Sequence, residues 1–153
     1  MLRAIFVLVF AGVFAASAFA QTQKARSREE LMQQVLHAAL DNIHTLRCGS
    51  DRCSPATAEE RKNPLLSLSE TSQIFGRGLF SGGADICQLE WGKRNYEPMM
   101  AYWRKQNKTE RQLALIGLIH QIAMQQIQKQ IGSNCPAEMK KDVESKLDFK
   151  PKS

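Results

Sequence analysis

The sequence predicts an all-α protein, an irregular or orthogonal bundle of five to six helices stabilised by disulfides. Helix-start signals recur along the chain, and apolar residues repeat at steps of three and four. Alternating apolar and polar runs, which would indicate strands, are nearly absent. Four cysteines follow an N-terminal export signal, and cysteines of exported proteins are typically paired.

The first 20 residues have the three parts of a cleaved secretory signal. Arg3 precedes the apolar run Ala4–Phe14, and the small-residue exit at residues 18–20 leads to Gln21. This run is shorter than the roughly 18 to 20 residues that span a bilayer, so no stable membrane anchor is expected. We therefore expect residues 1–20 to be removed, residues 21–153 to form a single helical domain, and the protein to be periplasmic.

The mature chain is predicted to begin with a long helix. Residues 27–30 have the capping-box spacing of a helix start, and an apolar stripe continues from there to the region of Cys48. Ser54-Pro55 predicts a short second helix, because proline is favoured at the first helical position. Asn63-Pro64 is expected to end that helix.

A second capping box, at residues 67–70, begins the next helix. Four glycines follow between residues 76 and 83, and each costs a helix interior about 1 kcal/mol relative to alanine. We therefore expect a short helix that ends in a bend. The segment at residues 86–95 then leads to Pro98, which starts or kinks a helical stretch through Trp103.

A third capping box, at residues 109–112, opens the most apolar helix of the mature chain. Its first half, residues 113–119, is apolar on all sides, so we expect it to be enclosed by the other helices. Gly117 within this run predicts the close approach of a neighbouring helix. A last helix is expected after Cys135-Pro136, with a frayed tail from Phe149 onward.

The cysteine spacing favours one of the three possible pairings. A bridge between Cys48 and Cys53 would close one predicted turn, and a bridge between Cys87 and Cys135 would tie the middle of the chain to the end of the apolar helix. The other two pairings stay open at this stage. The close pair has a C-x4-C spacing, which is neither the C-x-x-C redox motif nor a zinc-ligand pattern.

The charge pattern restricts the classes of partner. The formal net charge is +6, and the basic residues are interspersed with acidic ones rather than massed in a stripe. This pattern does not favour nucleic-acid binding, and it suits an anionic partner such as an acidic protein, a cell-wall polymer or a lipid surface. No cofactor is predicted, and the C-x-x-C-H motif for haem attachment is absent.

One segment, residues 91–105, interleaves aromatic and basic side chains. Tryptophan, tyrosine and arginine are the residue types that most often anchor protein interfaces. The alternative is that the two tryptophans of this segment cap the hydrophobic core at a bend. The candidate partner-binding residues are Trp91, Arg94, Tyr96, Tyr102, Trp103 and Arg104.

Two other groups of residues suggest different chemistry. His37, Asp41 and His44 have the spacing of one helical face, which makes them a candidate metal or small-ligand site. His120 follows the apolar run and could act as a buried general base. No G-x-S-x-G elbow accompanies it, so a core histidine is the favoured interpretation.

The sequence therefore favours a non-enzymatic exported protein that binds another protein of the cell envelope, as an inhibitor, immunity factor, chaperone or accessory subunit. The alternatives are a small-ligand or metal-binding protein and a hydrolase of envelope material with His120 as base. A homodimer is also compatible with an apolar edge at Ile127, Ile131, Met139 and Val143.

Overall fold

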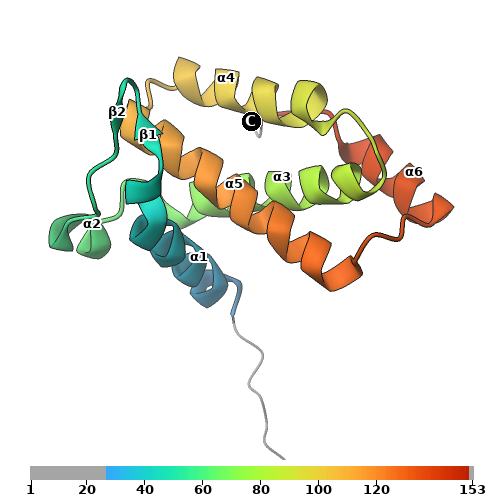
Figure 1. The fold of residues 1–153 in the computed structure, drawn as a ribbon, viewed down its shortest axis with the longest axis horizontal. Coiled ribbons are helices and arrows are strands. Elements are labelled where there is room, and N and C mark those ends of the chain that lie inside the picture. The colour runs from blue at the N-terminus through green and yellow to red at the C-terminus, as the bar shows by residue number, and fades with distance from the viewer. Residues whose placement is uncertain (1–26, 152–153) are drawn as a thin grey trace, which may run out of the picture.

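The computed structural model describes residues 27–151, which form six α-helices, two short η helices and a small hairpin (Figure 1). The all-α prediction is confirmed. The predicted signal at residues 1–20 lies outside the described residues. The helices are α1 (Arg28–Asn42), α2 (Ala58–Lys62), α3 (Leu68–Ile86), α4 (Glu97–Lys105), α5 (Glu110–Ile131) and α6 (Ala137–Lys146).

The helices α3 and α5 form the centre of the bundle. They lie against each other, with α1 across one end, α4 along one side and α6 at the other end (Figure 1). The prediction that residues 113–119 are enclosed is confirmed in part: Leu115, Ile116 and Ile119 of α5 are fully buried, whereas Ala114, Gly117 and Leu118 are half-buried. A second small cluster, formed by Ala84, Val143 and Leu147, holds α6 against α3.

The glycines of α3 allow its close contact with α5. A Cβ atom at Gly78 would lie 2.4 Å from the carbonyl oxygen of His120, and one at Gly82 would lie 2.8 Å from that of Met124. The prediction of a short helix and a bend is therefore wrong, since α3 runs unbroken over 19 residues. Close packing against α5 outweighs the low helix propensity of glycine.

Two expected helix boundaries also differ. Helix α1 ends at Asn42, and a short 3-10 helix, η1 (Ile43–Thr45), leads into the strands β1 (Arg47–Cys48) and β2 (Asp51–Arg52). Helix α2 is capped by Thr57 rather than Ser54, since Thr57 and Glu60 form a reciprocal capping box. That pairing satisfies two backbone amides, which the Ser54-Pro55 start would not do.

Helix α4 is preceded by a π-helical turn, η2 (Gly92–Tyr96). Pro98 has no N–H to donate to the carbonyl of Arg94, and that carbonyl instead accepts a 2.9 Å hydrogen bond from the backbone N–H of Phe149. The ring of Phe149 packs against Tyr102 at a centroid distance of 5.7 Å. The predicted frayed tail was expected to begin at Phe149, and this prediction is wrong for Phe149 itself, which is held in place by these two contacts.

Both disulfides are present in the favoured pairing. Cys48 bonds to Cys53 across the β1–β2 hairpin, and Cys87 at the end of α3 bonds to Cys135 just before α6. No described cysteine is free. Two disulfides indicate a protein that folds in an oxidising compartment.

Candidate functional site

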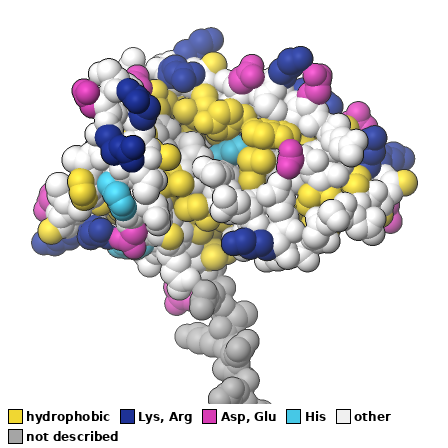
Figure 2. Space-filling view, viewed as in Figure 1, with side chains coloured by type: hydrophobic (Ala, Val, Ile, Leu, Met, Phe, Trp, Pro, Cys, Tyr) yellow, Lys and Arg dark blue, Asp and Glu magenta, His cyan; other side chains and the backbone are white. Residues whose placement is uncertain are grey.

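A groove runs along α5 on the side that faces η2 and α4, and we call it the α4–α5 groove. It consists of two adjoining hollows, of about 410 Å³ and about 310 Å³, which share Tyr96, Gly117 and Gln121. Figure 2 shows hydrophobic side chains gathered over this region, with a histidine side chain among them. We call the larger one the inner hollow and the smaller one the outer hollow. The walls of the inner hollow include Trp91, Tyr96, His120, Gln121, Met124 and Gln125.

Aromatic rings form the wall of the inner hollow. The Tyr96 ring lies 4.8 Å from that of His120, and the Trp91 ring lies 6.0 Å from it, between ring centroids. The indole Nε1 of Trp91 donates a 3.0 Å hydrogen bond to Asp85. A Cβ at Gly117 would lie 3.2 Å from the Tyr96 hydroxyl oxygen, so the glycine makes room for this tyrosine.

His120 is only 2% exposed and is joined to a chain of buried polar groups. Its Nε2 lies 2.9 Å from Oγ of Ser81, and Ser81 accepts a 2.7 Å hydrogen bond from Nδ2 of Asn95. Asn95 in turn bonds to Arg77 through both its amide oxygen and its amide nitrogen. Both Ser81 and Asn95 are completely buried.

This environment keeps His120 neutral. Burial, together with the positive charge of nearby Arg77, lowers the pKa of His120 to about 4. Desolvation penalises the charged imidazolium because the surroundings solvate it less well than water. The histidine is therefore uncharged at neutral pH.

The Ser81–His120 distance alone would suit a nucleophile and its base. Ser81, however, is 0% exposed and does not line the groove, so a substrate in the groove has no access to its hydroxyl. Ser81 therefore cannot serve as the nucleophile of the hypothesised hydrolase in which His120 is the base.

The predicted partner-binding residues separate into two groups. Trp91, Tyr96 and Arg104 line the groove. Arg94 is held by both carboxylate oxygens of Asp148, and Tyr102 packs against the C-terminal tail. Adjacent residues of a helix point in different directions. The segment at residues 91–105 therefore places some side chains in the groove and others against the C-terminal tail.

The prediction that Trp103 belongs to the partner-binding surface requires a correction. Its side chain is only 5% exposed and belongs to the main hydrophobic core. Its indole Nε1 has no hydrogen-bond partner among the described residues. The alternative interpretation, in which this tryptophan caps the core, describes it correctly.

The structure does not bring His37, Asp41 and His44 together into the predicted metal site. Helix α1 ends before His44, which lies in η1, so the helical register from His37 does not reach it. Asp41 forms an ion pair with Arg61. Within residues 27–151, no group of three or more histidine, cysteine or acidic side chains could hold a metal ion.

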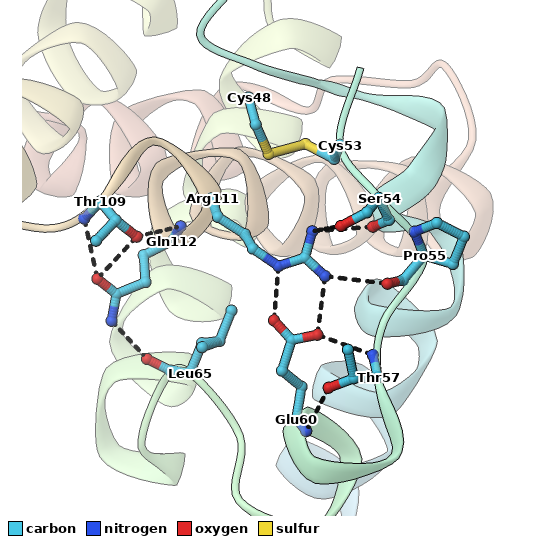
Figure 3. A network of polar contacts seen from close by, with 10 residues as sticks. All are labelled: Cys48, Cys53, Ser54, Pro55, Thr57, Glu60, Leu65, Thr109, Arg111 and Gln112. Atoms are coloured by element: carbon cyan, nitrogen blue, oxygen red, sulfur yellow. Dashed lines mark hydrogen bonds and ion pairs between the residues drawn. A yellow bond between two sulfur atoms is a disulfide. The ribbon is translucent and has the colours of Figure 1, made fainter. Parts of the chain in front are cut away.

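An ion pair that the sequence reasoning missed fixes the start of α5 beside the outer hollow. Arg111 donates to both carboxylate oxygens of Glu60, at 2.6 Å and 2.9 Å, and to the backbone carbonyl of Ser54 at 2.9 Å (Figure 3). The hydrogen bonds from Arg111 lower the pKa of Glu60 to about 2. The Thr57–Glu60 capping box was the sequence signal for part of this network.

Comparisons with protein families, with curated proteins and with solved structures gave no match to this chain. In the part of the chain that the structure describes, no helix has the length and apolar character needed to cross a membrane.

Proposed function

We propose that this chain is an exported, periplasmic protein that binds another protein through the α4–α5 groove, without catalysing a reaction on it. Inhibitors, immunity factors, chaperones and accessory subunits all act in this way. The observation that carries the proposal is the groove itself, in which half-buried Trp91 and Tyr96 lie beside the exposed amides of Gln121 and Gln125.

This combination of side chains suits recognition of a protein segment. Aromatic side chains contribute large apolar contact areas at interfaces, and amides pair with the backbone groups of a partner. The outer hollow adds Arg47 and Arg104 with one carboxylate, Glu110. An excess of positive charge there favours a partner with acidic residues at this end.

Photo-crosslinking in the native host tests the proposal. A benzophenone amino acid replaces Gln121, which lines both hollows, or Gln130, which is exposed on the same helix and lies outside the groove. We expect one defined protein to be crosslinked from position 121 and not from position 130, and to be lost from position 121 when Tyr96→Ala is added.

Two results would contradict the proposal. Equal crosslinking from both positions would mean that the groove has no special role in binding. Crosslinking from position 121 to a second copy of this chain alone would assign the groove to a homodimer.

A further inference from the structure

One hydrogen-bonding atom at the wall of the inner hollow has no partner among the described residues. His120 lines this hollow, and its Nδ1 has no hydrogen-bond partner among the described residues. The only fully buried side-chain nitrogen or oxygen without a partner in residues 27–151 is Nε1 of Trp103. The Nδ1 atom therefore retains contact with the solvent of the hollow.

The polar chain behind His120 determines which ring nitrogen carries the proton. A guanidinium only donates and a backbone carbonyl only accepts, so the contacts with Arg77 fix the orientation of the Asn95 amide. Asn95 then donates to Ser81. The Ser81 hydroxyl is completely buried and Nε2 of His120 is its one other partner among the described residues, so its hydrogen is satisfied only by donation to Nε2. A neutral imidazole that accepts at Nε2 must carry its hydrogen on Nδ1.

We propose that His120 donates its Nδ1–H to a neutral carbonyl oxygen of the bound partner, namely a backbone carbonyl of an extended segment that carries an apolar side chain. This inference rests on the proposed function and assigns the chemistry of the same groove. The side-chain hydrogen bonds from Arg77 to Asn95, from Asn95 to Ser81 and from Ser81 to His120 all run toward the imidazole, and such chains polarise the final donor.

The charges around the inner hollow favour a neutral acceptor over a carboxylate. The described residues that line it include no aspartate, glutamate, lysine or arginine. Asp85 lies at the rim, where its two oxygens accept from Trp91 and Gln128, and its negative charge opposes an anion. Arg77, whose positive charge acts on His120, is already committed to Asn95 and to the backbone carbonyls of Lys146 and Leu147. A carboxylate buried there would lack a partner.

The same features favour an extended segment over a helix. The carbonyls inside a helix already accept bonds from their own chain, whereas an extended chain presents free carbonyl and N–H groups. Gln121 and Gln125 are exposed beside His120, and each amide both donates and accepts. Trp91, Tyr96 and Met124 provide the apolar surface for the partner's side chain.

Nuclear magnetic resonance of the secreted protein with ¹⁵N-labelled histidine tests this proposal with two matched probes. N-acetyl-L-leucine N-methylamide carries two neutral carbonyls on an apolar residue, and N-acetyl-L-leucine replaces one of them with a carboxylate. We expect the free protein to carry the proton on Nδ1, and the diamide to shift that resonance and bind about tenfold more tightly than the acid.

Two serines of α3 provide the variant and its control. Ser81→Ala removes the donor to Nε2, so the proton should redistribute between the two ring nitrogens and diamide binding should weaken by about threefold or more. Ser69→Ala, at an exposed position of the same helix, should leave both properties unchanged. Circular dichroism of both variants checks that the helices are intact.

The proposal is overturned if the free protein carries the proton on Nε2, if the acid binds as tightly as the diamide, or if neither probe shifts the His120 resonance. The outcome of the crosslinking experiment does not depend on any of these three results, so the two proposals can fail separately. A partner crosslinked from position 121 together with an unshifted His120 would retain the proposed function and remove the carbonyl assignment. A shifted His120 without any crosslinked partner would show that the hollow accepts a small amide and would remove both the proposed function and the assignment to a partner's backbone.

Discussion

The contact between α3 and α5 predicts opposite effects for two glycine substitutions on the same helix. At Gly78 a Cβ would lie 2.4 Å from the carbonyl oxygen of His120 and 2.6 Å from Cβ of Ala123, whereas at Gly76 it would meet nothing within 4 Å. An unstrained carbon-to-oxygen contact is about 3.3 to 3.6 Å, so Gly78→Ala requires a displacement of about 1 Å between the two helices.

The magnitudes follow from this displacement. A gap of 0.5 to 1 Å forfeits about a quarter to a half of the dispersion energy of the atoms that separate. Overpacking of this kind costs about 1 to 3 kcal/mol, and Gly78→Ala affects the centre of the bundle, so we expect a net loss of about 2 to 3 kcal/mol. Gly76→Ala should instead stabilise α3 by about 0.5 to 1 kcal/mol, because alanine favours the helix.

Urea and thermal unfolding followed by circular dichroism measure both effects. With about 3 to 4 °C per kcal/mol for a domain of this size, Gly78→Ala should lower the Tm by about 6 to 12 °C and Gly76→Ala should raise it by about 2 to 4 °C. A Gly78→Ala protein as stable as the wild type would refute the close packing of α3 on α5.

Three further predictions concern charge and covalent links. The pKa of Glu60 is lowered to about 2, so its ion pair with Arg111 stabilises the fold above the ordinary carboxyl pKa and is lost as the pH falls toward 2. Glu60→Gln should cost about 1 to 2 kcal/mol in urea unfolding at pH 7 and almost nothing at pH 2; an equal cost at both pH values would contradict this role. Because the pKa of His120 is lowered to about 4, unfolding takes up a proton between pH 6.5 and 4, and the wild type should lose up to about 3 kcal/mol of stability over this range. His120→Gln should flatten that profile, and an unchanged slope would mean that another group titrates. The disulfide between Cys87 and Cys135 links residues 48 positions apart, and replacing both cysteines by serine should lower the free energy of unfolding by about 4 kcal/mol. The same change at Cys48 and Cys53 should lower it by about 2 kcal/mol, because that loop is shorter. Urea unfolding that ranks the two disulfides the other way would contradict the loop-entropy reasoning.

Local signals predicted much of the fold because they act over a few residues. The capping boxes that begin at Ser27, Ser67 and Thr109 all form as expected, with reciprocal hydrogen bonds between each cap and the third helical residue. Most of the apolar run of α5 is buried as expected, although Ala114, Gly117 and Leu118 line the outer hollow, and the expected last helix forms as α6. Each of these features depends on spacing within one element.

Tertiary contacts account for what the sequence did not reveal. The continuity of α3 depends on the fit of Gly78 and Gly82 against α5, whereas propensity alone predicts a break there. The docking of the tail depends on the carbonyl of Arg94 that Pro98 leaves free. Neither effect is visible in a local window of sequence.

The candidate site was predicted only in part. Trp91, Tyr96 and Arg104 were found because aromatic and basic residues cluster in one segment. The polar chain from Arg77 to His120 joins residues from three separate elements, and no spacing in the sequence brings Ser81 and Asn95 beside this histidine.

The affinity of the crosslinked partner for two matched charge variants tests the central claim most directly. Gln121→Lys places a cation in the α4–α5 groove, and Gln130→Lys places the same cation on the same helix outside the groove. We predict that Gln121→Lys weakens binding by about tenfold or more while Gln130→Lys changes it by less than about twofold, with both proteins equally helical. Equal affinities for the two variants would contradict the assignment of the groove as the binding site.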